Sequence, residues 1–248
     1  MTIKSPEKPA IKYPHIRQMV ETFYAIQNLR IQAGNRLGAY DRMGIPPERS
    51  KEMHSWVDER LSLLELELGR KITSEVKTFP IFNTWLLKVK GIGPVLSGCL
   101  LAWIVDIGRF ANISKLWRYC GMAVIDGKSE RPTKGEKLHY SPVMKLTCWK
   151  IGESFVKSGG YYREIYDQYK ARIKALHPEP VNSGRKSRDG KPIMAFTPGH
   201  IHSMAKRKAV KQFLADMWIA WRKLEGLTVT MPYAIEKLGH TTYQEPEI

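Results

Sequence analysis

Residues 85–101 read WLLKVKGIGPVLSGCLL, and this stretch decides the expected fold. Apolar side chains precede Lys90, two glycines flank Ile92, and Pro94 opens a second apolar run. Glycine adopts the positive φ angles of a tight turn, and proline has the φ angle of a first helical residue. The stretch therefore predicts two short helices joined by a hairpin turn at residues 90–94, with Ile92 buried between them.

The start of the second helix is a predicted phosphate site. Its first backbone N–H groups lack partners within the helix, and the helix dipole adds a partial positive charge. The turn resembles the hairpin of the helix-hairpin-helix family, whose backbone amides hold a DNA phosphate without reading the bases. An ordinary corner between two helices is the alternative. The residues expected to contact phosphate are Lys88, Lys90, Gly91, Ile92 and Gly93.

The charge of the chain indicates a polyanionic partner. Its 248 residues include 40 Lys and Arg against 24 Asp and Glu, which gives a net charge of +16. The excess is greatest over residues 81–175, with 16 basic and seven acidic residues. Such a field attracts nucleic acid. A basic soluble protein, or one that meets acidic lipid, is the alternative, but no basic amphipathic helix with a strong apolar face accompanies the charge. We expect DNA as the partner.

Nothing in the sequence predicts a metal, a cofactor or a membrane. The three cysteines have no metal-ligand spacing and are expected to be reduced thiols of a cytoplasmic protein: Cys99, Cys120 and Cys148. His200 and His202 are two residues apart on an expected helix and therefore face different sides of it. The most apolar run, residues 95–105, has about half the length of a membrane span.

The apolar spacing predicts an all-α protein. Residues 15–80 are expected to form a helical hairpin for packing or homo-oligomerisation, because apolar residues recur there at helical spacing around a break at residues 44–47. The other expected parts are a flexible basic arm (1–14), a helix-hairpin-helix DNA-binding domain (81–177), a basic loop (178–199) and a C-terminal helical region that packs on the DNA-binding domain (200–248).

A second basic cluster lies between residues 185 and 211, with eight basic residues and one acidic residue. It predicts a further phosphate contact, and a solvated basic helix face is the alternative. The residues proposed for this contact are Arg185, Lys186, Arg188, Lys206, Arg207 and Lys208. The apolar and aromatic residues that follow, between Phe213 and Leu224, are expected to be core.

Further motifs follow the hairpin along the chain. In order they are Asp106-Ile107-Gly108-Arg109-Phe110, Leu116-Trp117-Arg118-Tyr119-Cys120-Gly121-Met122, Ser129, the basic turn Lys134-Gly135-Glu136-Lys137, the run Ser141 to Lys145, Tyr161-Tyr162 and Ala205-Lys206-Arg207-Lys208. This order resembles the C-terminal domain of the bridge-RNA-guided insertion-sequence transposases, the IS one-ten group. The resemblance covers residues 82–224 and implies DNA binding in a mobile-element, phage or recombination context.

In that family the C-terminal domain contributes a catalytic serine, and Ser129 is the matching position. Basic residues near it would neutralise phosphate charge: Lys128, Arg131, Lys134 and Lys137. The family has glycine after the serine, whereas this chain has Glu130. Because an acidic neighbour repels a phosphodiester, an ordinary loop serine is the favoured interpretation, and Ser129 is the one catalytic candidate.

The family's recombinases also carry an N-terminal nuclease-like domain with metal-binding acids on strands. Residues 1–80 of this chain predict helices without such spaced carboxylates, and phosphoryl transfer of that type needs them. We therefore expect a DNA-binding protein without strong sequence specificity rather than an enzyme. The alternatives are a serine-dependent transposase or recombinase acting through Ser129, and an RNA-binding or structural module of a larger assembly.

Overall fold

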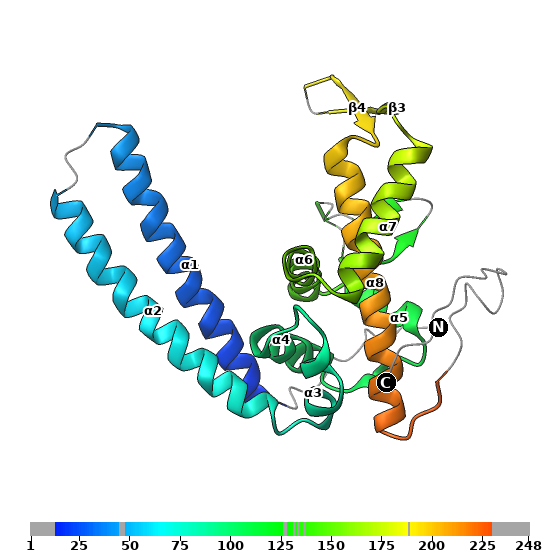
Figure 1. Ribbon diagram of the computed structural model, residues 1–248, viewed down its shortest axis with the longest axis horizontal. Coiled ribbons are helices and arrows are strands. Elements are labelled where there is room, and N and C mark those ends of the chain that lie inside the picture. Colours follow the sequence, from blue (N-terminus) through cyan, green and yellow to red (C-terminus); the bar gives the residue numbers. More distant parts are fainter. Residues whose placement is uncertain are drawn as a thin grey trace. The chain divides into compact units, whose positions relative to one another are not determined.

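The computed structural model describes residues 13–44, 48–125, 128–130, 132, 134–135, 137–187 and 189–229. This part of the chain is mostly helical, which confirms the predicted all-α class (Figure 1). Two small two-stranded sheets accompany the helices. The chain divides into two units, and the boundaries fall between Phe82 and Asn83, between Gly93 and Pro94, and between Asp106 and Ile107.

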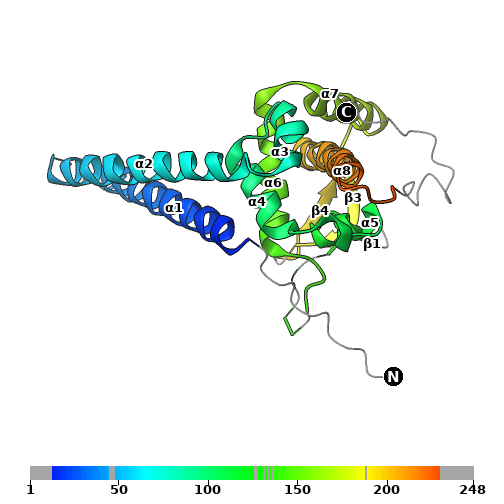
Figure 2. The ribbon, with the colours of Figure 1, turned by 90° about the horizontal axis from the view of Figure 1, so that it is seen from below.

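The first unit consists of a long helical pair and one shorter helix. The pair, α1 (Pro14–Arg42) and α2 (Glu48–Val76), runs side by side in Figures 1 and 2. The shorter helix, α4 (Pro94–Ile104), packs against both. A Cβ atom on Gly98 would lie 3.1 Å from a methyl carbon of Val20 and 3.1 Å from one of Ile72. Glycine at this position therefore allows α4 to approach both long helices.

The place of α4 differs from the sequence expectation, which put residues 81–177 into one domain. Instead α4 belongs to the unit that contains α1 and α2. The reason lies in its composition, because α4 has no charged residue and is buried from Ser97 to Ile104. A helix that is apolar on every side needs apolar cover all round, and the adjacent long pair supplies it through Val20, Ile72 and Val76.

The second unit is built around α8 (Pro198–Leu224). Helices α5 (Ile113–Tyr119), α6 (Pro142–Ser158) and α7 (Tyr161–Leu176) and the 3-10 turn η2 (Ile107–Arg109) contact it. Trp218 of α8 is buried and donates a 2.8 Å hydrogen bond to the carbonyl of Phe110. The ring of Phe213 stacks on Trp85, with 5.7 Å between the ring centroids. The predicted apolar core on this helix is confirmed, except that Leu224 is exposed.

Two local elements differ from the sequence expectation. The short apolar helix before the glycine turn is divided into α3 (Pro80–Thr84) and a 3-10 turn, η1 (Leu86–Lys88). The expected loop 178–199 contains a β-hairpin of β3 (Val181–Lys186) and β4 (Pro192–Ala195). Five of the six β3 residues are exposed. A strand with two solvated faces lacks the alternation that marks a strand in a sequence, and the prediction therefore missed it.

Three further expectations concern cysteines, metals and membranes. All three cysteines are buried and free of disulfide bonds. Within the described residues, His, Cys, Asp and Glu side chains form no cluster suited to a metal ion. None of the described helices has the length and apolar character that crossing a membrane requires.

Candidate nucleic-acid site

The candidate site begins at the end of α5, where the chain turns toward Ser129. Gly121 has a φ of 66°. Its N–H bonds to the carbonyl of Arg118, and the N–H of Met122 bonds to the carbonyl of Trp117, at 3.0 and 2.8 Å. This pattern ends a helix through a left-handed glycine. The chain then enters β1 (Val124–Ile125), which pairs with β2 (Lys128–Ser129).

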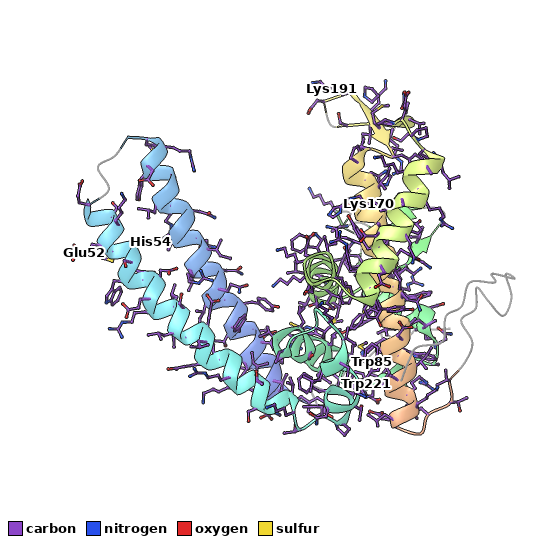
Figure 3. The ribbon with its side chains drawn as sticks, viewed as in Figure 1. Glu52, His54, Trp85, Lys170, Lys191 and Trp221 are labelled. Carbon is purple, nitrogen blue, oxygen red and sulfur yellow. The ribbon has the colours of Figure 1, made fainter. Side chains whose placement is uncertain are left out.

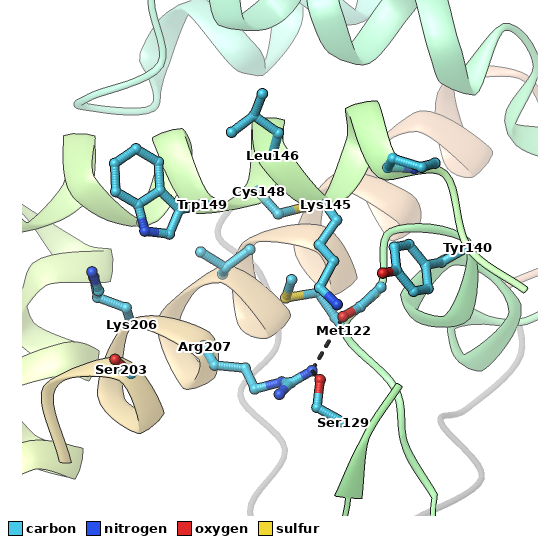
Figure 4. Close-up of a pocket in the computed structure, with 14 residues that line it drawn as sticks. Met122, Ser129, Tyr140, Lys145, Leu146, Cys148, Trp149, Ser203, Lys206 and Arg207 are labelled. Atoms are coloured by element: carbon cyan, nitrogen blue, oxygen red, sulfur yellow. Dashed lines mark hydrogen bonds between the residues drawn. The ribbon is translucent and has the colours of Figure 1, made fainter. Parts of the chain in front are cut away.

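Ser129 and Arg207 meet across 78 residues of sequence. The Nη2 atom of Arg207 lies 3.2 Å from the Oγ atom of Ser129 and donates to it (Figure 4). The same nitrogen also donates to the carbonyls of Gly121 at 3.1 Å and Ala123 at 3.4 Å. The sequence placed Ser129 and Arg207 in two separate candidate sites, and the structure brings them into one.

Helix α6 forms the opposite wall of this site. Lys145, Trp149 and Gly152 follow one another at helical spacing and line a cavity of about 460 Å³ together with Ser129 and Arg207. A Cβ atom on Gly152 would lie 3.3 Å from a methyl carbon of Val210. Glycine therefore lets α6 and α8 approach closely beneath the cavity, and the larger side chains on either side of it form the walls.

The basic residues on α8 are not equivalent. Lys206 forms an ion pair with Glu153 of α6 and lines the cavity. Arg207 is half-buried, and burial lowers the pKa of its guanidinium. Its Nε atom is buried without a hydrogen-bond partner among the described residues. Lys208 is exposed. The three basic residues proposed for this phosphate contact therefore differ in exposure and in partners.

Two further lysines add positive charge around Arg207. Lys145 donates a 2.9 Å hydrogen bond to the carbonyl of Glu130, and its Nζ atom lies 4.2 Å from the ring centroid of Tyr140. Burial lowers the pKa of Lys211 to about 8, and the neighbouring Arg207 and Lys208 add to this shift. Cations that lie close enough to Lys211 to lower its pKa favour binding of an anion.

The carboxylate of Glu130, the acidic residue that follows Ser129, is bound to His139. One oxygen accepts a 2.8 Å hydrogen bond from the His139 backbone N–H and lies 3.1 Å from its Nδ1 atom. These contacts lower the pKa of Glu130, so the carboxylate is charged at neutral pH. Its negative charge is partly compensated by the hydrogen bonds, which weakens the objection to an anion beside Ser129.

The glycine turn has two local features that the sequence predicts, a positive φ at its first glycine and a buried Ile92. Gly91 has a φ of 95°, and the N–H of Ile92 bonds to the carbonyl of Val89 at 3.0 Å. Ile92 is buried, as predicted, whereas Gly93 is exposed and a Cβ atom there would meet nothing within 4 Å. The Ser154 hydroxyl of α6 donates a 2.5 Å hydrogen bond to the Gly91 carbonyl. The turn is thus held to α6 at Gly91, whereas Gly93 has free space beside its backbone.

The hairpin and the cavity meet different faces of α6. Gly91 lies against Ser154, Phe155 and Ser158, whereas Lys145, Trp149 and Gly152 line the cavity. Successive helical residues are turned by about 100°, and Ser154 and Ser158 therefore project away from Lys145 and Trp149. The candidate phosphate residues accordingly form at least two separate surfaces of the second unit.

The remaining predicted contact residues are exposed where they are described. They are Lys88, Lys90, Lys134, Lys137, Arg185 and Lys186. In Figure 3 Lys191 lies at the tip of the β3–β4 hairpin and Lys170 on α7, which add to the exposed charge of the second unit. Lys128 belongs to β2, and only its backbone is described. Arg131 and Arg188 lie outside the described residues.

Sequence reasoning missed two residues of the cavity, Lys145 and Trp149. Lys145 belongs to a motif of the family resemblance but was not assigned a contact. Trp149 is 57% exposed, which is unusual for a large aromatic side chain. Their spacing on α6 is the available signal, because residues 142, 145, 149 and 152 share one helix face.

No protein-family model matches the chain, and none of the curated proteins matches it either.

Proposed function

We propose that this protein binds DNA through its phosphate backbone, without strong sequence specificity, and that the Ser129–Arg207 cavity is a principal contact. The hydrogen bond between Arg207 and Ser129 carries the proposal. It joins the family's serine position to a half-buried guanidinium in a cavity also lined by Lys145 and Lys206. The resemblance to transposase C-terminal domains supports a mobile-element, phage or recombination context for this binding.

Arg207 is suited to a phosphate ligand. Nη2 is occupied by the protein, whereas Nη1 donates no hydrogen bond within the described residues. A guanidinium donates through several N–H groups in a fixed plane, so one edge can hold the protein while another binds a phosphate oxygen. The Ser129 hydroxyl supplies a further donor. Charge-assisted hydrogen bonds of this kind are about twice as strong as neutral ones.

The hairpin at Gly91 and Gly93 supports the same function at a second surface. Gly93 is open, and Lys88 and Lys90 beside it are exposed. Contacts of this type position a duplex and carry no sequence information. A unit with two phosphate-binding surfaces should bind a long or bent duplex more tightly than a short one, because the longer or bent duplex can contact both surfaces.

A matched pair of charge removals tests the proposal. Arg207→Gln and Arg70→Gln each remove one positive charge, the first from the cavity and the second from the exposed surface of α2. We expect Arg207→Gln to weaken duplex binding about tenfold and Arg70→Gln to leave it nearly unchanged. Fluorescence anisotropy measures binding, and a thermal unfolding curve checks that both variants fold. Equal effects of the two variants would refute the cavity as the contact.

A serine-dependent strand-transfer enzyme is the second candidate. The contact of Arg207 with the Ser129 hydroxyl favours it, because that guanidinium could neutralise a phosphate beside the serine. In that reaction Oγ loses its proton and forms a bond to phosphorus, the bond from phosphorus to one sugar oxygen breaks, and that oxygen takes up a proton and leaves as the hydroxyl of a DNA end. A covalent adduct trapped on nicked or junction DNA, and lost on Ser129→Ala, would establish the enzyme. We expect no adduct, and Ser129→Ala, which removes one neutral donor from the phosphate contact, should weaken binding by less than about tenfold.

RNA is the remaining alternative ligand. Phosphate contacts alone do not distinguish DNA from RNA, whereas the 2′-hydroxyl and the A-form groove do. Competition between duplex DNA, single strands, a four-way junction and structured RNA separates them. DNA should displace a labelled duplex at the lowest concentration.

A further inference from the structure

Trp149 has a large aromatic side chain that is not part of the hydrophobic core. It lies on α6, is 57% exposed, and lines the cavity that contains Ser129 and Arg207. The Nζ atom of Lys206 lies 5.7 Å from its ring centroid, and Figure 4 shows the two side chains at the same end of the cavity. Because Glu153 holds Lys206 by an ion pair, the indole lies beside a positioned cation.

The cavity offers two kinds of contact. Trp149 supplies a flat apolar surface, whereas Ser129, Lys145 and Arg207 supply hydroxyl and cationic donors. A ligand that makes both kinds of contact has a planar ring and an anionic group joined by a short linker. The cavity, at about 460 Å³, is within the range of small-molecule sites. A nucleotide is the ligand class with this combination.

A base inside a duplex is stacked on both sides and offers no free ring face to an indole. An unpaired base does, and aromatic side chains bind such bases by stacking. We propose that the cavity holds one unpaired nucleotide of a DNA substrate, with its base on Trp149 and its phosphate at Arg207 and Ser129. This inference rests on the proposed DNA binding and adds a preference for DNA with an unpaired base.

The charge around Trp149 favours a nucleotide over a protein partner. Three basic side chains line the same cavity, Lys145, Lys206 and Arg207. Of these, Lys206 has a carboxylate partner, Glu153. Apolar protein interfaces are depleted in lysine at their centres. An exposed tryptophan surrounded by cations therefore fits a stacked base with its phosphate better than an apolar protein surface.

The test compares Trp149→Ala with Trp56→Ala. Trp56 lies on α2 and is 59% exposed, so both variants lose an equally exposed indole. Affinities are measured for a perfect duplex and for the same duplex with one bulged nucleotide. We expect the wild-type chain and Trp56→Ala to prefer the bulged duplex at least about fivefold. Trp149→Ala should lose this preference, so that its affinities for the two duplexes are nearly equal, and Trp149→Phe should retain most of the preference.

The outcomes separate this inference from the proposed function. If the wild-type chain binds the perfect duplex but shows no preference for the bulge, the nucleotide site is refuted and DNA binding stands. A preference that Trp149→Ala retains refutes it equally. If the wild-type chain binds no DNA, both proposals fail. A change in the oligomeric state of Trp149→Ala, measured by light scattering, would assign Trp149 to a protein interface and also refute the inference.

Discussion

The phenol of Tyr162 donates a 2.9 Å hydrogen bond to a carboxylate oxygen of Asp216 inside the second unit. The other oxygen of Asp216 accepts a 2.9 Å hydrogen bond from the Gln212 amide. Asp216 is only 1% exposed, and burial raises its pKa to about 6 although both hydrogen bonds lower it. A carboxylate whose pKa is raised by folding makes stability depend on pH.

We predict that this carboxyl destabilises the fold as pH rises. The folded protein holds the proton up to about pH 6 and the unfolded chain only to about pH 4. The stability contributed by the neutral acid is therefore present below about pH 4 and lost between about pH 4 and 6. Asp216→Asn, which stays neutral, should unfold with a free energy about 1–3 kcal/mol higher than wild type at pH 7.5. Urea denaturation from pH 4 to 8 measures this difference.

The control is Asp167→Asn, because Asp167 is an exposed carboxylate that pairs with Arg163 on α7. Its replacement should change the free energy of unfolding by less than about 1 kcal/mol. A pH profile of Asp216→Asn that matches wild type would contradict the raised pKa.

The two glycines of the hairpin should respond differently to alanine. At Gly91 the φ of 95° is unfavourable for alanine, and the new Cβ would lie 3.2 Å from the Phe155 ring. We expect Gly91→Ala to lower the free energy of unfolding by about 1–3 kcal/mol. Gly93→Ala, which meets open space, should change it by less than about 1 kcal/mol. Thermal or urea unfolding of both variants measures these changes. An equal loss of unfolding free energy at the two positions would contradict the described turn.

Gly93 also provides a clean test of the hairpin as a phosphate site. A valine there would project a branched side chain from an open backbone position and block close approach of a phosphate. Gly93→Val should therefore weaken duplex binding several-fold in a folded protein. The same change at Gly91 is a poor probe, because its Cβ would crowd Phe155, Ser154 and Ser158. Unchanged affinity of a folded Gly93→Val would show that the hairpin contacts no DNA.

Lys208 is the exposed member of the basic run on α8, so it tests charge without disturbing internal contacts. We predict that Lys208→Ala lowers the slope of log affinity against log salt by about one, because one fewer counterion is released. Sequence preference should not change. A salt titration by anisotropy measures the slope, and an unchanged slope would place Lys208 away from the DNA.

The sequence predicted the helical class, the glycine turn and the buried Ile92, because apolar spacing and glycine chemistry are local signals. It did not predict that α4 belongs to the first unit rather than to the expected hairpin domain. The apolar surface that covers a helix depends on the tertiary structure and not on the local sequence. Nor did the sequence show that Arg207 turns inward to Ser129. Both residues were candidates, but their contact depends on how α8 packs beside the end of α5.

Duplex binding as a function of salt tests the central claim most directly. We predict that the wild-type chain binds two duplexes of unrelated sequence with nearly equal affinity. The logarithm of that affinity should fall with log salt at a slope of about −3 or steeper, as expected for three or more phosphate contacts. Absence of binding at low salt, or a slope near zero, would contradict DNA recognition through the phosphate backbone.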